Sequence, residues 1–385
     1  DMFQKKWGDV GSEFFDVVRM SPTDISEGIF EDPVLQASLQ FSTGVIRVKN
    51  TVEGMGFGTL RMLTRFGRWS MSRGGTNMIA KAMVRMLLSH GGQITHQRQV
   101  DKVILEGSKA VGVRLDDGTE VRAKRAVVSG VDPGQTFLKF VGEDNLEKDF
   151  VKGIKDWKMN DFTLFGAHWV IKEAPKYKVG EKYPDMNQAF RTALGYNRPE
   201  ELTEHWEECT RGEVPSIPAG ELWVLSQHDR SQAPAPEGYH TAGFWQFVPY
   251  NIRDGGPEKW DEIKDEYMHK VMDRWREFAP NMTPENVVYE YAYTPLDTER
   301  TLINMVHGDA HQGGYLHGQT AEGRQPYKTP IENLYMCGSS CHPSGAITFA
   351  PGYNAVNTIA EDYGMERWWK KPDFLDGVTK FKNWE

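Results

Sequence analysis

Residues 333–360 decide the fold, and they read NLYMCGSSCHPSGAITFAPGYNAVNTIA. This stretch contains no Asp, Glu, Lys or Arg, yet it is rich in Ser, Thr, Asn, Gly and Pro. Leu334 to Cys337 is typical of a buried strand end, Gly338 to Ser340 of a close backbone approach, and Gly352 to Ala360 of a helix start. Backbone N–H groups and the helix dipole would converge there, so the pattern predicts a site for an anion or a polar ring. A tightly packed structural turn would produce the same pattern.

The composition of the whole chain restricts the class of protein. With 385 residues, of which 39% are hydrophobic and 26% charged, the chain is long enough for two globular domains. It contains no run of eighteen apolar residues, and its formal charge of -9 argues against a nucleic-acid-binding protein. Three cysteines, Cys209, Cys337 and Cys341, are too few for a disulfide framework and favour a reducing, cytoplasmic compartment.

Hydrophobic spacing predicts the order of the other elements, with a helix and a small β-meander before an aromatic-rich sheet. The predicted elements are a helix over 76–90, meander strands over 94–103, 110–115 and 121–128, aromatic-rich strands over 162–171, 222–227 and 243–248, and a helix over 258–278. The last helix has one apolar stripe and one charged face, so we interpret it as a cover for the sheet without a chemical role.

Two blocks of the sequence resemble the phytoene desaturase-type FAD-dependent oxidoreductases. The first begins at Ser72-Arg73-Gly74-Gly75 and continues through the helix and the meander to the segment 126–133, which reads AVVSGVDP. The second covers 329–338, TPIENLYMCG, with His342-Pro343 and Gly352 after it. Gly308-Asp309 and Gly318-Gln319 precede the second block in a compatible order. The resemblance covers most of the chain at low identity.

The resemblance implies an α/β fold of mixed α+β type, the two-domain flavoprotein fold of desaturases and amine oxidases. It assigns 70–135 and 300–385 to an FAD-binding domain, and 1–69 and 136–299 to a substrate-binding domain. It implies an enzyme that desaturates or dehydrogenates a hydrophobic substrate, isoprenoid, terpene-like or alicyclic, with FAD as the cofactor. We expect such an enzyme in the cytoplasm, with peripheral membrane contact compatible with an apolar substrate.

The resemblance also carries individual residues over to this chain. The implied cofactor contacts are Val100, Gly130, Gly338, Ser339, Ser340, Gly352, Tyr353 and Asn354. His342 is the candidate for acid/base chemistry or flavin contact, and Asp309 is the candidate for orienting the flavin or the turn beside it. A histidine that only forms structural hydrogen bonds and an aspartate that only caps a loop are the alternatives. Between His342 and Gly352 the chain is about three residues longer than the family's His-Pro-Gly-Gly-Gly-x-Pro-Gly pattern, so the substrate-side wall of the flavin is expected to differ.

One family feature is missing from the sequence. Such proteins open with a strand, a G-x-G-x-x-G turn and a helix that hold the FAD diphosphate. The glycines at 54, 56 and 58 do not supply this turn, because Thr59 stands where the third glycine belongs. We therefore expect a partner subunit, or a segment removed from this sequence, to complete the FAD site in a heteromer.

Several alternatives stay open at this stage. His307, His311 and His317 with Asp309 suggest a metal, but their spacing matches no common site, so we expect none. Cys337 and Cys341 are either a covalent flavin link or redox pair, or free buried thiols. The aromatic residues of the middle segment line an apolar tunnel or pack a core; they include Trp169, Trp223, Phe244, Trp245 and Phe247.

Two other functions fit the same fold. One is a non-catalytic escort that binds a lipid or a protein, and the other is a redox-neutral flavin isomerase. An absorbance spectrum would separate the escort from a flavoenzyme.

Overall fold

The structure is a computed structural model that describes residues 2–44, 48–63, 70–233, 238–316, 318–319, 323–345 and 347–370. The chain packs as two compact units. One unit comprises residues 1–96, 158–309 and 313–317, and the other comprises 97–157, 310–312 and 318–385. The domain division expected from the sequence stays a prediction, because packing alone does not show what each part binds.

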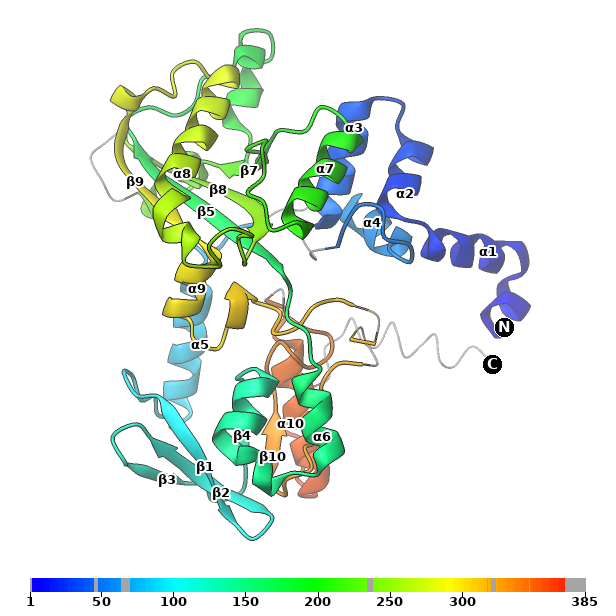
Figure 1. Cartoon of the computed structure of the whole chain (residues 1–385), viewed down its shortest axis with the longest axis vertical. Coiled ribbons are helices and arrows are strands. Elements are labelled where there is room, and N and C mark those ends of the chain that lie inside the picture. The colour runs from blue at the N-terminus through cyan, green and yellow to red at the C-terminus, as the bar shows by residue number, and fades with distance from the viewer. Residues whose placement is uncertain are drawn as a thin grey trace. The chain divides into compact units, whose positions relative to one another are not determined.

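The first unit is built on a five-stranded antiparallel sheet (Figure 1). The strands, in the order in which they lie side by side, are β6 (Thr192–Leu194), β7 (Gly220–Trp223), β8 (His240–Pro249), β5 (Phe162–Ile171) and β9 (Val287–Tyr293). The predicted strands over 162–171 and 243–248 are confirmed by β5 and β8. The prediction over 222–227 is wrong after Trp223, because residues 225–227 form a single helical turn. There the buried Ser226 accepts a hydrogen bond from Thr241 N at 3.0 Å.

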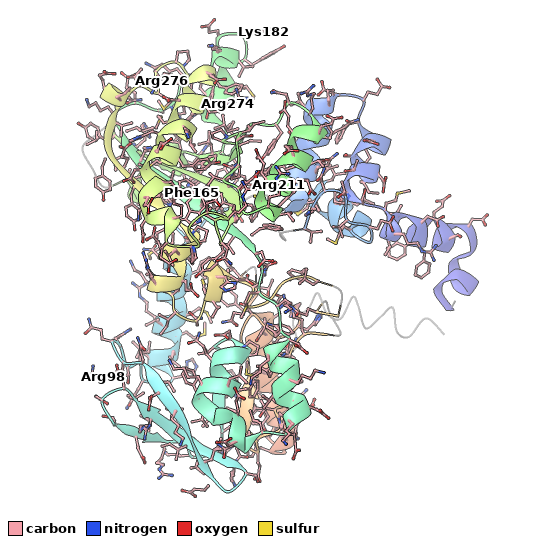
Figure 2. The ribbon with its side chains drawn as sticks, viewed as in Figure 1. Arg98, Phe165, Lys182, Arg211, Arg274 and Arg276 are labelled. Carbon is pink, nitrogen blue, oxygen red and sulfur yellow. The ribbon has the colours of Figure 1, made fainter. Side chains whose placement is uncertain are left out.

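Helix α8 (Lys259–Phe278) covers one face of this sheet. Alternate residues of β5 point toward this helix and are fully buried, namely Phe165, Ala167, Trp169 and Ile171. The ring of Phe165, which is labelled in Figure 2, lies near two rings of α8. Its centroid is 5.8 Å from that of Trp260 and 5.1 Å from that of Tyr267. Each such buried side chain contributes roughly 1.5–3 kcal/mol of transfer free energy. The helix predicted over 258–278 is therefore confirmed.

On the opposite face of the sheet, the described residues of this unit cover one end. Helices α3 (Pro33–Thr43) and α7 (Pro199–Thr210) pack together there, and Trp206 of α7 stacks on Phe247 of β8 with ring centroids 5.8 Å apart. The other helices of this unit are α1 (Met2–Arg19), α2 (Pro22–Ile29), α4 (Gly56–Leu63), α5 (Asn77–Ser89) and α9 (Pro295–Thr301). Helix α5 confirms the helix predicted over 76–90, although none of its side chains is buried.

The second unit contains two small sheets. Its elements are β1 (Val100–Glu106), β2 (Lys109–Leu115), β3 (Glu120–Arg122), β4 (Val127–Ser129), the π-helix Gly134–Gly142, α6 (Lys148–Lys155), β10 (Leu334–Met336) and α10 (Ala350–Asp362). Strands β1 to β3 form the predicted antiparallel meander, whereas β4 and β10 form a parallel pair.

Two strand predictions in this unit are wrong in their bounds. The strand predicted over 121–128 is divided, because Ala123 N donates to Val111 O in the meander while Val127 N donates to Asn333 O beside β10. The strand predicted from residue 94 begins only at Val100, since Gln97 has a positive φ of 57° that interrupts an extended backbone.

His205 of α7 is a buried imidazole in the covered part of the sheet. It is 3% exposed, and its Nδ1 lies 3.4 Å from Gln246 Nε2, the donor of that contact. Burial lowers the pKa of His205 to about 3. The folded protein therefore keeps this imidazole neutral at pH values where the unfolded chain protonates it.

The pH dependence of stability tests this burial. Below pH 6.5 the unfolded chain binds a proton at His205 that the folded chain does not, so the free energy of unfolding falls by about 1.4 kcal/mol per pH unit until pH approaches 3. In His205→Gln, the loss between pH 7 and pH 5 should be about 2 kcal/mol smaller than in the wild type, measured by urea unfolding. The exposed His96→Gln is the control and should keep the wild-type dependence. Equal losses in His205→Gln and wild type would contradict a buried, neutral imidazole.

Candidate functional site

The carboxyl ends of β4 and β10 carry the two glycine turns that the sequence singled out. Gly130 follows β4 and Gly338 follows β10, and the strands pair in parallel with Met336 opposite Ser129. A Cβ added to Gly338 would lie 2.6 Å from Gln312 Oε1 and 2.7 Å from Gly130 O, so the turn requires glycine. In open parallel sheets, ligands bind at this edge, outside the carboxyl ends of the strands.

Gln312 connects the two turns. Its Nε2 donates to Gly130 O at 3.1 Å, and its Oε1 accepts from Ser340 N at 3.3 Å. Ser339 is half-buried in the same turn, whereas Ser340 is fully buried. The structure thus brings four of the predicted cofactor contacts together. Sequence reasoning missed Gln312, because no motif or periodicity marks it.

The other predicted contacts lie in the first turn of α10 and at the start of β1. Apart from its two chain neighbours and the backbone of its own helix, no described residue has a heavy atom within 4 Å of a Cβ added to Gly352, so this turn has open space beside its backbone. Asn354 Nδ2 donates to Tyr327 Oη at 2.9 Å, and the Tyr327 hydroxyl donates to His342 O. Tyr353 is half-buried beside them. Val100 begins β1 and packs against the core of the second unit.

The two predicted catalytic residues have very different surroundings. His342 is exposed, in the loop between β10 and α10. Asp309 is fully buried in the first unit, where its carboxylate accepts from Asn160 N at 3.1 Å, Asn160 Nδ2 at 3.0 Å and Gly313 N at 2.9 Å. These bonds show how Asp309 fixes its own loop. A chemical role for either residue stays a prediction.

The cysteines of the second unit favour the structural alternative over a redox one. Both Cys337 and Cys341 are free thiols. Burial raises the pKa of Cys337, and it raises the pKa of Cys341 to about 12. Because the thiolate is the nucleophile, thiols with raised pKa values react poorly near neutral pH.

The histidines that suggested a metal have separate partners. His307, in the first unit, stacks on Tyr250 with ring centroids 4.4 Å apart. His311, in the second unit, has its Nδ1 3.3 Å from Ser344 Oγ. His317 lies outside the described residues. Within the described part of the chain, no group of three His, Cys, Asp or Glu side chains could hold a metal ion.

The part of the sheet that no described helix of the first unit covers is an aromatic surface. It consists of His168 on β5, Trp223 on β7, Trp245 on β8, and Tyr289, Tyr291 and Tyr293 on β9, which we call the aromatic face. Trp245 is 38% exposed and Tyr289 is 63% exposed. Contiguous exposed aromatic area of this kind marks interaction sites.

The aromatic residues named from the sequence therefore divide into two groups. Trp169 and Phe244 are fully buried in the core under α8, and Phe247 packs against α7. Trp223 and Trp245 lie on the aromatic face. The core interpretation is confirmed for the first group, and an apolar binding surface stays a prediction for the second.

A charged pair borders the aromatic face, and sequence reasoning missed it. Arg191 Nη1 donates to Glu221 Oε2, and these side chains are only 25% and 18% exposed. The guanidinium carbon of Arg191 lies 5.7 Å from the ring centroid of Trp223 and 5.8 Å from that of Trp245, which are cation–π distances. Burial raises the pKa of Glu221, and the neighbouring Arg191 opposes this effect. The pair forms between residues 30 positions apart in the sequence, so no local sequence motif predicts it.

Comparison with known proteins identifies the relatives of this chain. The flavin containing amine oxidoreductase family matches residues 2–162. The chain is 26% identical, over 95% of its length, to one subunit of the limonene dehydrogenase of Castellaniella defragrans, and it covers 69% of that polypeptide. It is 25% identical, over 82% of its length, to a phytoene desaturase (lycopene-forming) of Paracoccus sp., of which it covers 60%. The chain is a relative of the phytoene desaturase-like FAD-dependent oxidoreductases.

A solved structure supports the fold of this phytoene desaturase-like chain. An oxidoreductase from Methanosarcina mazei aligns with 89% of the chain and 68% of its own length, at a TM-score of 0.51 and 16% identity. At the level of the family, the predicted flavoprotein fold, the oxidoreductase class and FAD as the cofactor are confirmed. Among the helices that the structure describes, none combines the length and the apolar character needed to cross a bilayer.

The turn at Gly338 of this chain gives a direct test of the site geometry. Gly338→Ala should destabilise the protein by about 1–3 kcal/mol, because the added methyl would overlap Gln312 Oε1 and Gly130 O. Gly352→Ala is the matched control, and it should be neutral or stabilising by up to ~1 kcal/mol, since open space surrounds it in a helix. Thermal unfolding followed by circular dichroism measures both. Equal melting temperatures for the two variants would contradict the close approach at Gly338.

Proposed function

We propose that this chain carries out the substrate-binding part, and a share of the flavin-binding part, of an FAD-dependent dehydrogenase or desaturase for a hydrophobic, terpene-like or alicyclic substrate. The observation that carries the proposal is the aromatic face, where Trp245, Tyr289 and Tyr291 are exposed, in a relative of flavoprotein oxidoreductases. The limonene dehydrogenase and phytoene desaturase relatives are named for hydrophobic substrates, which agrees with such a surface.

The described residues of the second unit fit a flavin nucleotide in two respects. The turns at Gly130 and Gly338 place backbone at the carboxyl edge of a parallel strand pair, and the Gln312 side chain bridges them. The space beside Gly352 is open, and the segment from β10 to the first turns of α10 has no ionised side chain to repel a diphosphate or compete with a polar ring. We propose that Gly130, Gly338 to Ser340 and Gly352 to Asn354 hold the cofactor. When bound, FAD supplies the acceptor for a hydride removed from the substrate.

The protein's own side chains then bind and orient the substrate and accept the proton that it loses. The rings of Trp223, Trp245 and Tyr291 offer flat apolar contacts that hold a hydrocarbon and exclude water from it. His342 is exposed, so its imidazole can take the proton lost with the hydride and pass it to solvent. Asp309 is proposed as a positioning residue, since its carboxylate is held by Asn160 and Gly313.

We also propose that further polypeptide completes the FAD site, from a second chain or from a segment outside this sequence. Two exposed apolar features support it, one in each unit. Helix α5 leaves Met86 57% and Leu88 52% exposed, and Val128 on β4 is 44% exposed although parallel strands are ordinarily covered on both faces. The limonene dehydrogenase relative is itself named as one subunit of its enzyme.

The absorbance spectrum tests the flavin proposal. We expect flavin bands between roughly 350 and 500 nm when the chain is purified with the polypeptide that completes it, and mass spectrometry of the copurifying chains identifies that polypeptide. Gly338→Ala should weaken the bands, whereas Gly153→Ala, on the exposed side of α6 and outside the proposed site, should keep them. A colourless preparation that still oxidises substrate would overturn the proposal, and a colourless, inactive one that binds lipid or protein would favour an escort.

A tryptophan variant tests the aromatic face as the substrate surface. Trp245→Ala should weaken binding of p-menthane, a saturated ten-carbon hydrocarbon, by about three- to tenfold, because the half-buried indole loses its contact area with the ligand. Headspace gas chromatography measures how much of this volatile ligand the protein retains. Trp368→Ala is the control, as this tryptophan is 81% exposed in the other unit, and it should bind as the wild type does. A Trp245→Ala variant with unchanged affinity would place the ligand elsewhere.

A further inference from the structure

A cavity of about 310 Å³ lies within the first unit, beside the edge strand β6. Its apolar walls include Phe41 of α3, Met62 of α4, Phe190 and Ala193, and the Arg191–Glu221 pair supplies its charged wall. The volume is at the small end of the ~300–1,000 Å³ range of small-molecule sites. At ~30 Å³ per water-sized atom it holds about ten non-hydrogen atoms.

The charged wall selects among ligands by its net charge. Arg191 and Glu221 neutralise each other, so the pair gives neither a carboxylate nor an ammonium ligand a compensating opposite charge. Bringing an ionised ligand into a mostly apolar cavity without such compensation is costly. A neutral ligand avoids that cost, and hydrogen bonds to charged groups are stronger than those between neutral groups.

The fixed position of the guanidinium adds geometric selection. Arg191 is held by its bond to Glu221 and by the faces of Trp223 and Trp245, so little side-chain freedom remains to be lost on binding. A guanidinium only donates hydrogen bonds and a carboxylate only accepts them. A hydroxyl group can both donate and accept a hydrogen bond. A ketone can only accept one, and a hydrocarbon can do neither.

We propose that this cavity binds the hydroxylated end of a small alicyclic or isoprenoid alcohol, with the hydroxyl beside the Arg191–Glu221 pair and the carbon skeleton against Phe41, Met62 and Phe190. The proposal rests on the proposed function, since it names a substrate or product class for that binding unit. The site lies next to the aromatic face, so a longer skeleton extends from the cavity along Trp245.

The test compares two ligands that share one skeleton, menthol and p-menthane, on the full chain. Headspace gas chromatography gives both affinities, and isothermal calorimetry tests whether menthane carboxylate displaces menthol. We expect the wild type to prefer menthol by about tenfold, because its hydroxyl can form a hydrogen bond with a charged group of the pair and the hydrocarbon cannot. The carboxylate should not compete at equal concentration.

Two variants and one control locate this preference. Arg191→Leu/Glu221→Leu removes both charges together, an exchange that buried pairs tolerate, and it should abolish the preference for menthol. Glu221→Gln keeps the shape and should reduce the preference several-fold, which covers the case of a double variant that fails to fold. Tyr177→Phe removes a hydroxyl from a second, apolar cavity of about 280 Å³ in the same unit and should leave the preference unchanged.

The outcomes separate this inference from the proposed function, because binding is measured without flavin. Equal wild-type affinities for menthol and p-menthane, or a preference that survives in the double variant, would overturn the inference even in a yellow, active enzyme. A preference that depends on Arg191 and Glu221 supports it even if the preparation contains no flavin, in which case the proposed function alone fails.

Discussion

The register between β5 and β8 is the constraint on which the first unit depends. Phe162 lies opposite Pro249 and Ile171 opposite His240, and the pairing continues without interruption over all ten residues. Because side chains alternate between the faces of a strand, a shift by one residue would exchange the buried and exposed sets. Phe165 and Trp169 would then face away from α8. The same alternation therefore produces both the core and the aromatic face.

The second unit depends on a different pairing, between strands that are about 200 residues apart in the chain. Parallel pairing of β4 with β10 brings their carboxyl ends together, and Gln312 bridges the turns that follow. Gly338 packs so closely against Gly130 O and Gln312 that its turn has no room for a side chain of its own. The cofactor site that we propose at this edge thus uses residues whose own chemistry is ordinary.

Local patterns were sufficient to predict β5, β8, α5, α8 and the glycine turns, because period and turn residues encode each of them. The same patterns did not predict that the segment 121–128 divides into two strands. Val121 and Val127 have the same side chain, but Val121 pairs with β2 and Val127 pairs with β10. Whether an aromatic residue belongs to the core or to the aromatic face depends on which side of its strand it points to and on which face of the sheet a helix covers. Gln312 and the Arg191–Glu221 pair are contacts between distant segments, and only the folded chain brings them together.

The position of the cavity beside the edge strand β6 has a consequence for evolution. Its walls come from α3, α4, β6 with the residues before it, and one side chain of β7, whereas the core under α8 is built from the other face of the sheet. Substitutions at Met62 or Phe190, which lie outside the buried core clusters, can enlarge or reshape the cavity without altering the packing of Phe165 or Trp169. If the cavity binds a ligand as we propose, related chains can therefore diverge in the molecules they accept while keeping the core under α8.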